Sequence, residues 1–405
     1  MGHHAKKTVS AAEATLNSGH WINKVPTIGA VVGIIGIGTA AGLGFDEHHR
    51  FFYSYLVAFL FFMSLTLGGL FFTLLHFLTR SGWGIVLRRL AENIASVMPL
   101  MALLFIPVFL GMHDLYHWSH ADAVAHDQVL AGKQAYLNPN FFTIRAVLFF
   151  AVWIGLALTF RKASLAQDTS GDHTISRKLM SRSAIGMLLF ALSLTYGAFD
   201  WAMSLDPHWY STMFGVYFFA GCGVSIYATM SLFTVYLPKW GVLGEDILTE
   251  EHRHAAGKMM FGFTCFWAYV WFSQFFLIWY ADIPEETAWF LHRSGPWFPI
   301  SAGLFAFHFA LPFVFLMARP MKRNKTTLAI AGCWMLMMHY IDLYWVVMPT
   351  IDHHPHPSLV DLGAFLGVGG LWVAAVAYRA QRNLLVPIND PRLPESLAFE
   401  DKGGG

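Results

Sequence analysis

Residues 51–78 read FFYSYLVAFLFFMSLTLGGLFFTLLHFL, a run without aspartate, glutamate, lysine or arginine. A helix of about 20 apolar residues crosses the ~30 Å hydrocarbon core of a bilayer, so this run is long enough to span it. Nine further apolar runs lie before and after it. Because helices satisfy their own backbone groups in lipid, we predict an all-α polytopic membrane protein. Its ten predicted spans are Val25–Leu43, Phe51–Leu78, Ile94–Met112, Phe141–Phe160, Ala184–Met203, Ser211–Leu237, Met259–Ala281, Phe298–Ala318, Leu328–Met348 and Val360–Tyr378.

The composition of the 405-residue chain agrees with this prediction. Only 13% of its residues are charged, against about 25% in soluble domains, and 56% are hydrophobic. A net charge of +1 excludes a nucleic-acid partner bound through a basic face. The first 24 residues lack the apolar core of a cleaved signal peptide. Each cysteine stands alone, so no CxxCH haem motif and no cysteine cluster is present: Cys222, Cys265 and Cys333.

Lysines and arginines predict the orientation, because they accumulate in cytoplasmic loops. With these spans, 22 of the 26 cations fall on the side that includes both termini. We therefore expect a cytoplasmic N-terminal segment (1–24), a ten-helix transmembrane domain (25–378) and a cytoplasmic C-terminal tail (379–405). Eleven of the 20 histidines fall on the opposite, outer side. The four exceptional cations are Arg50, Lys133, Arg145 and Arg293.

Glycines recur along the first span in a pattern that superficially resembles a nucleotide-binding loop. No strand precedes them, so close packing against another helix is the favoured interpretation. The glycines are Gly29, Gly33, Gly36, Gly38 and Gly42.

Ionisable side chains inside the spans are the main candidates for function, because each costs at least a few kcal/mol to insert. His339 and Asp342 are three residues apart in the ninth span and share one helix face. Such a pair can exchange a proton in a low-dielectric site, although a static hydrogen bond between helices is the alternative. His308 lies mid-span and is interpreted as a proton relay, a ligand contact or a structural histidine. His76 lies near enough to a span end to reach the interface.

The fifth span adds Tyr196 and Asp200, four residues apart, and Asp206 follows in the outer loop. We expect Asp200 about one turn inside the outer surface. Glu92, before the third span, is interpreted as an acid favoured by the dipole at a helix start. The candidates for a proton pathway are therefore His76, His308, His339, Asp342, Tyr196, Asp200 and Asp206.

The outer segment 111–140 is the longest loop, with one short helix and a turn at Asn138-Pro139 predicted in it. Its residues 113–120, HDLYHWSH, place histidines at i, i+4 and i+7, a spacing also used by zinc ligands. Histidine with tyrosine and tryptophan is equally typical of an aromatic belt that docks an extramembrane partner. We favour docking and predict no bound metal. The docking candidates are His113, Asp114, Tyr116, His117, Trp118 and His120.

Three stretches carry a resemblance to a known family: residues 199–221, FDWAMSLDPHWYSTMFGVYFFAG, residues 113–120, and residues 341–349, IDLYWVVMP. Together they resemble the NrfD/polysulfide-reductase type of quinone-interacting membrane subunit, in its ten-helix form. The likeness covers essentially the whole chain. It is strongest to the smaller, ActF-like, of the two paralogous membrane subunits of bacterial alternative complex III.

This resemblance implies two four-helix bundles, spans 2–5 and 6–9, flanked by spans 1 and 10. Asp200 and Asp342 would then lie in the last helix of each bundle. It implies a complex in the bacterial cytoplasmic (inner) membrane with a paralogous membrane subunit, multihaem and monohaem cytochrome c subunits and an iron–sulfur subunit. That complex oxidises quinol and reduces a soluble electron carrier, with haem c and iron–sulfur clusters on the partner subunits.

One departure from the family bears on the role of this chain. Gly215-Val216 stands where the larger paralogue has paired prolines. Proton conduction or a structural role is therefore favoured over quinol oxidation, quinone binding is left open, and the isolated chain is expected to be non-catalytic.

Two other functions fit parts of the pattern. An autonomous proton-coupled secondary transporter also needs intramembrane acids, but it predicts helix breaks at equivalent positions of two halves. Pro107 and Pro312 interrupt the third and eighth spans, which are not equivalent. A haem b cytochrome needs paired histidines at one depth, and only His308 and His339 meet that condition.

Overall fold

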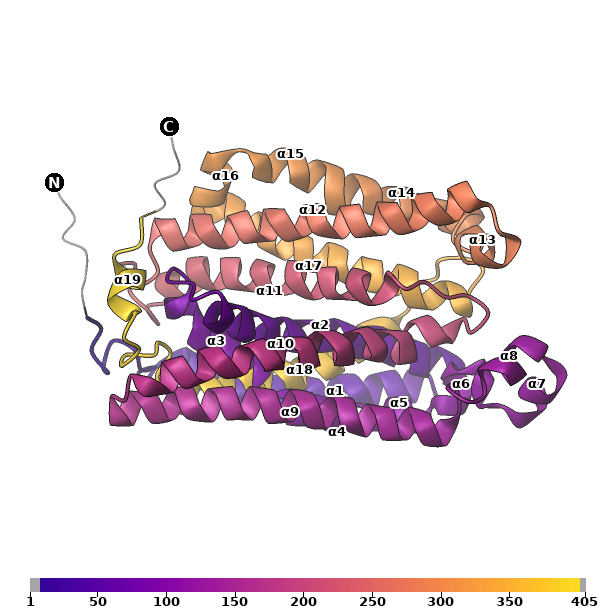
Figure 1. Ribbon diagram of the computed structural model, residues 1–405, viewed down its shortest axis with the longest axis horizontal. Helices are drawn as coiled ribbons and strands as arrows, with labels where there is room; N and C mark the ends of the chain where they lie inside the picture. The colour runs from indigo at the N-terminus through magenta and orange to yellow at the C-terminus, as the bar shows by residue number, and fades with distance from the viewer. Residues whose placement is uncertain (1–7, 401–405) are drawn as a thin grey trace.

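The computed structural model describes residues 8–400 and places them in helices and connecting loops, with no strand in this range (Figure 1). Lys6, Lys7 and Lys402, which count toward the predicted orientation, lie outside the described residues. Ten helical segments are long and apolar enough to cross a membrane, which confirms the predicted number. They are Trp21–Leu43, His48–Leu78, Ile85–Leu110, Pro139–Ser170, Thr174–Leu205, Phe214–Lys239, Glu250–Ala281, Gly295–Met317, Lys325–Thr350 and Leu359–Gln381.

Eight of the ten segments are built on one long α-helix each. These helices are α1 (Val25–Leu43), α2 (His48–Leu78), α9 (Pro139–Ser170), α10 (Thr174–Trp201), α11 (Phe214–Lys239), α12 (Glu250–Ala281), α17 (Lys325–Val347) and α18 (Leu359–Gln381). The short helices α16 (Arg319–Arg323) and α19 (Leu393–Leu397) lie in the loop before α17 and in the C-terminal segment.

The third and eighth segments are interrupted. The third consists of α3 (Ile85–Ala95), α4 (Met98–Leu104) and α5 (Ile106–Leu110), and the eighth of α14 (Phe298–Gly303), the π-helical segment η5 (Leu304–Ala310) and α15 (Leu311–Met317). Proline stands at each interruption: Pro99 and Pro107 lie in the first turns of α4 and α5, and Pro312 lies in that of α15. A proline cannot donate to the carbonyl four residues earlier, and for Pro312 that residue is His308. The π geometry therefore falls on the turn that carries His308.

Several spans begin earlier than hydropathy predicts. The third begins at Ile85 rather than Ile94, because the charged residues of α3 are buried in ion pairs instead of remaining outside the helix. Glu92 lies inside α3 and accepts hydrogen bonds from Arg88 and Arg89 at 3.3 and 2.9 Å. Its interpretation as a helix-start acid is therefore wrong.

The outer segment after α5 holds three short helices rather than one: α6 (Met112–Leu115), α7 (Ala121–His126) and α8 (Gln128–Lys133). Asn138-Pro139 is a helix start, not a turn. The Asn138 side chain accepts a hydrogen bond from the Phe141 amide at 2.8 Å, and Pro139 is the first residue of α9. Asparagine at the N-cap followed by proline is a common helix start.

Helix α2 lies at the centre of the packing and contacts α3, α9, α10, α11, α17 and α18. Helix α11 in turn contacts α10, α12 and α17, while α12 packs on η5 and α15. These contacts bring residues of α2, α11, α12, η5 and α17 close together.

Helices α1 and α18 pack along each other through glycine, as the glycine pattern predicts. A Cβ atom on Gly36 would lie 2.5 Å from the Gly367 amide nitrogen, and one on Gly33 would lie 2.7 Å from that of Leu371. These backbones approach more closely than any side chain allows. Gly29 makes the same kind of contact, but Gly38 and Gly42 have nothing within 4 Å.

The two ends of the described chain meet at one end of the molecule, where the Leu385 amide donates to the Ala14 carbonyl at 2.7 Å. Figure 1 shows α19 and α16 at this end. Helices α6 to α8 and α13 (Pro284–Leu291) lie at the opposite end. The two ends are named below after the predicted orientation, inner for the first and outer for the second.

Candidate functional site

Asp342 lies in the last third of α17 and is 2% exposed. The Tyr217 hydroxyl of α11 donates a short hydrogen bond to one carboxylate oxygen, and the Trp267 indole of α12 donates to the other at 3.0 Å. Among residues 8–400 no salt bridge includes Asp342. Two neutral donors from two other helices therefore hold this carboxyl group.

His339 lies one turn before Asp342 but bonds to a different helix. Its Nε2 atom is 2.8 Å from the Ser64 hydroxyl of α2, and its Nδ1 atom has no hydrogen-bond partner within residues 8–400. Gly221 permits this position, because a Cβ atom there would lie 2.5 Å from the imidazole. The shared face predicted for His339 and Asp342 thus brings the two residues into one region without a direct hydrogen bond between them.

His308 completes this region from the π-helical segment η5. It is fully buried, and neither ring nitrogen has a hydrogen-bond partner among the described residues. Its ring packs against Trp267 with the centroids 3.9 Å apart, so Trp267 contacts both His308 and Asp342. We name Ser64, Tyr217, Trp267, His308, His339 and Asp342 the Asp342 cluster.

Asp200, in the last turn of α10, has a different environment. Arg145 of α9 donates to both of its carboxylate oxygens, from Nε at 2.7 Å and from Nη2 at 3.0 Å. The third donor of Arg145 goes to the Tyr136 carbonyl at 2.8 Å, and its guanidinium lies 3.8 Å from the Tyr136 ring. Asp200 is therefore a fully paired carboxylate. Tyr196 is 46% exposed on the helix surface and does not join it.

Arg293 lies beyond Asp342 toward the outer end. It donates to the Trp345 and Val346 carbonyls, at 3.2 and 2.6 Å, in the last turn of α17, and it packs 3.4 Å from the Trp289 ring. A cation at a helix C-terminus is favoured by the helix dipole. Burial lowers the pKa of Arg293 to about 9, although the negative charge of Asp206 raises it. With this pKa, Arg293 is charged at neutral pH. The predicted pathway residue Asp206 thus lies near this buried cation.

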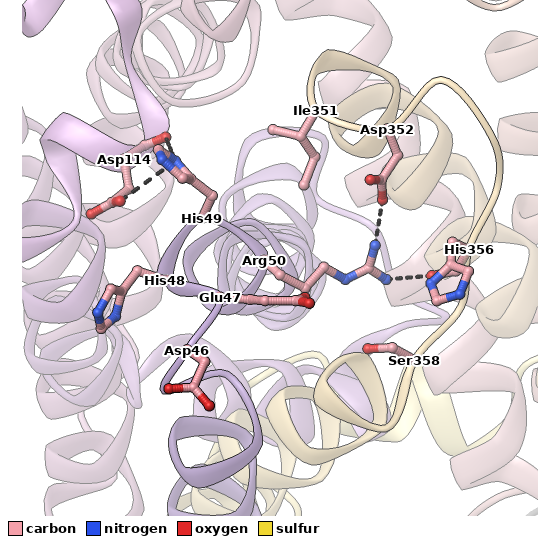
Figure 2. Close-up of a pocket in the computed structure, with 10 residues that line it drawn as sticks. All are labelled: Asp46, Glu47, His48, His49, Arg50, Asp114, Ile351, Asp352, His356 and Ser358. Carbon is pink, nitrogen blue, oxygen red and sulfur yellow. Dashed lines mark hydrogen bonds and ion pairs between the residues drawn. The ribbon is translucent and has the colours of Figure 1, made fainter.

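A cavity of about 670 Å³ opens at the outer end (Figure 2). Arg50 lies at its centre and bonds to Asp352, to Asp361 at 2.5 Å, and to the His356 carbonyl at 2.6 Å. Figure 2 shows His49 on the other side, where Nδ1 lies 3.1 Å from the Asp114 carbonyl. The other acidic and histidine residues lining the cavity are Asp46, Glu47 and His48. Three of the outer histidines and four acids therefore line a cavity around a fixed arginine.

The six docking candidates divide into two groups. Tyr116 and Trp118 are at most 2% exposed, and they donate to the Trp201 and Ser204 carbonyls at 3.1 Å each. They hold the outer loop on α10 and its extension, so they are not available to a partner. His113, His117 and His120 are exposed, and Asp114 is half-buried beside His49.

His76 lies at the inner end of α2, is 4% exposed and lines a cavity there. Its Nδ1 atom is 2.8 Å from the Phe72 carbonyl, its ring stacks on Phe72 at 3.8 Å, and Nε2 has no partner within residues 8–400. It is therefore a buried histidine separate from the Asp342 cluster.

Within residues 8–400, no three histidine, cysteine or acidic side chains are grouped so as to hold a metal ion. An apolar groove of about 1040 Å³ lies between α1, α18, α2 and α17. Phe61, Tyr340 and Phe365 line it, and the Phe61 ring also packs against His339 at 5.7 Å. Its size and lining suit a long apolar molecule.

Sequence reasoning missed the partners of these groups. Tyr217 and Trp267 resemble ordinary core aromatics in sequence, and Ser64 is a single small residue in an apolar run. Arg145 and Arg293 are two of the four cations predicted on the outer side. This exceptional position is the sequence signal that could have identified them. Neither a protein-family model nor a curated protein matches this chain.

Proposed function

We propose that the chain is an integral membrane subunit of a quinol:electron acceptor oxidoreductase of the alternative complex III type, and that it conducts protons. The membership rests on the resemblance of residues 113–120, 199–221 and 341–349 to NrfD-type subunits. In this proposal the ten helices form two four-helix bundles with flanking helices 1 and 10, and both termini are cytoplasmic. The partners are a paralogous membrane subunit, multihaem and monohaem cytochromes c and an iron–sulfur subunit.

The observation that supports proton conduction is the Asp342 cluster. Buried polar atoms nearly always have hydrogen-bond partners, yet His308 and His339 keep three ring nitrogens without one in the described chain. Asp342 has no cationic partner to fix its charge, so a proton can bind it without breaking an ion pair. Histidine and carboxyl groups that are not committed to ion pairs are suited to passing protons.

The groups proposed to conduct protons form a series from the inner to the outer end of the molecule. His76 lies at the inner end, His308, His339 and Asp342 in the interior, and Asp206 with the acidic cavity around Arg50 at the outer end. We assign Asp200 a structural role, because Arg145 binds both of its oxygens. Quinone binding by this chain, if the complex uses it, is assigned to the apolar groove beside His339.

The test is proton translocation by the complex purified from native membranes and reconstituted in vesicles. We expect His339→Ala and Asp342→Asn to abolish or strongly reduce proton translocation while the complex still assembles. Unchanged quinol oxidation together with unchanged translocation in both variants would contradict proton conduction. Purification in mild detergent tests membership separately, because a chain that never co-purifies with cytochrome c subunits is not a subunit of this complex.

A secondary transporter is the second candidate, favoured by the interruptions in the third and eighth segments. These segments hold different places in the two proposed bundles, second in one and third in the other. Transport of a solute by the purified chain alone in vesicles, driven by a proton gradient, would support this candidate instead.

A further inference from the structure

A basic cavity of about 500 Å³ lies at the inner end of the molecule, where α2, α3 and α10 meet the C-terminal segment. Four arginines and two serines line it: Arg80, Arg88, Arg177, Arg392, Ser81 and Ser176. The only carboxylate among the lining residues is Asp390. The cavity therefore has an excess of positive charge at its wall.

Two of the arginines are paired and two are not. Arg88 bonds to Asp390 at 2.6 Å, and Arg392 bonds to Glu395 at 2.6 and 2.8 Å. Burial raises the pKa of Asp390, but the charges and hydrogen bonds of Arg88 and Arg392 together bring the pKa below its usual value, so this carboxylate is already paired. Arg80 and Arg177 take part in no ion pair among residues 8–400. Their charges remain available to a ligand.

Two helices begin beside the cavity, and side chains already bond to amides of their first turns. Helix α3 begins beside the cavity at Ile85, and α10 begins beside it at Thr174. The Thr174 amide of α10 donates to the Asp172 carboxylate at 2.8 Å, and the Val86 amide of α3 donates to the Ser396 hydroxyl at 3.4 Å. The positive end of a helix dipole disfavours cations, yet Arg177 follows directly after the first residues of α10. The helix ends are therefore already satisfied, and a bound anion would pair with the two free arginines.

Arg80 is held in place by the backbone. Its φ of +53° is a left-handed conformation that residues other than glycine rarely adopt, and Arg392 donates a hydrogen bond to its carbonyl. This turn between α2 and α3 fixes where the Arg80 side chain begins. The cavity wall also includes the apolar side chains of Phe77, Ile85 and Met180.

We propose that this cavity binds the phosphate group of an anionic phospholipid, with Arg80 and Arg177 as its charged contacts and the serines as hydrogen-bond donors. The apolar side chains accommodate the glycerol end of the lipid. Basic pockets between transmembrane helices on the cytoplasmic side commonly bind such headgroups. The site lies apart from the Asp342 cluster, although His76, the inner group of the proposed proton series, also lines this cavity.

The experiment titrates the purified full chain in neutral detergent with phosphatidylglycerol and measures bound lipid by native mass spectrometry. We expect Arg80→Gln with Arg177→Gln to weaken binding about 25-fold, roughly fivefold for each arginine. Lys178→Gln is the matched control, because it removes a neighbouring cation that does not line the cavity. Arg80→Lys with Arg177→Lys keeps the charge and should retain most of the binding.

Three results would overturn the proposal. Equal phosphatidylglycerol binding by the wild type and the double glutamine variant would remove these arginines from the site. Equal binding of zwitterionic phosphatidylcholine would show that net anionic charge is not recognised. Binding of inorganic phosphate that excludes the lipid, with no lipid binding of its own, would assign the cavity to a soluble phosphate. The thermal unfolding of each variant without added lipid checks that loss of binding does not come from misfolding.

Discussion

Asp200 and Asp342 occupy similar places in the sequence pattern but opposite electrostatic environments. Each lies near the outer end of a long helix, α10 or α17, and each is at most 2% exposed. Arg145 binds both oxygens of Asp200, whereas Asp342 receives only the Tyr217 hydroxyl and the Trp267 indole. Burial of an acid therefore does not define its role. The charge of its partner decides whether it is a fixed ion or a group that can take up a proton.

The two sites differ in the charge state of the carboxyl group that their donors stabilise. A guanidinium that donates two parallel hydrogen bonds is matched to an ionised carboxylate. A phenol and an indole are neutral, so a proton on Asp342 does not leave a buried cation behind. The same change, carboxylate to amide, should therefore have different consequences at the two positions.

Asp200→Asn should give the largest effect on stability. Removing one partner of a buried ion pair leaves the other charge uncompensated, and we expect a loss of about 3–5 kcal/mol. Thermal unfolding of the purified chain in detergent measures it. Arg145→Gln combined with Asp200→Asn should recover much of the loss, because no unpaired charge remains. A double variant as unstable as the sum of the two single variants would mean that the two residues do not act as a pair.

Tyr217→Phe should give the second largest effect. It removes one of two hydrogen bonds to Asp342, which we expect to cost about 1 kcal/mol and to slow proton translocation. Tyr55→Phe is the matched control, since Tyr55 is also buried and donates to the Leu104 carbonyl at 2.8 Å outside the cluster. Both variants should lose similar stability, but only Tyr217→Phe should change translocation. Equal translocation in both would separate Tyr217 from the pathway.

Asp342→Asn should change stability by less than about 1 kcal/mol, although it removes the proton-binding group. The amide is close in shape to a neutral carboxyl group, and no salt bridge is broken. Infrared spectroscopy gives a second readout, because the band of a protonated carboxyl group should disappear in Asp342→Asn and persist in Asp200→Asn. A loss of stability as large as that of Asp200→Asn would show that Asp342 is a charged, structurally paired group.

The parts of the fold that follow from hydropathy could be predicted from sequence. The ten spans are set by apolar length, and Gly29, Gly33 and Gly36 were correctly expected to pack closely against another helix. Boundaries were less accurate, because ion pairs such as those of Glu92 bury charged residues in helices that hydropathy starts too late. Pro312 can be read in the sequence, but the π-helical turn that accompanies it at His308 could not be predicted from the sequence.

The candidate site was only partly predictable, because it depends on how each helix is rotated about its axis. Asp342 and its donors are separated by 125 and 75 residues in sequence, and Asp200 and Arg145 by 55. Spacing within one helix placed His339 and Asp342 on one face, but it could not show that they bond to different neighbours. The four cations on the outer side, which are exceptions to the charge asymmetry, are the sequence signal that points to such partners. Arg50, Arg145 and Arg293 are each buried and fixed by named partners.

Tyr196→Phe should give the smallest effect, and it tests whether sequence spacing alone identifies a pathway residue. Tyr196 lies four residues before Asp200, but it is 46% exposed and takes no part in the Asp200–Arg145 pair. We expect stability within about 0.5 kcal/mol of the wild type, as for other surface changes, and unchanged proton translocation. A marked loss of translocation would place a proton route along the exposed face of α10. It would also reverse the comparison, since Asp200 rather than Asp342 would then lie beside the conducting group.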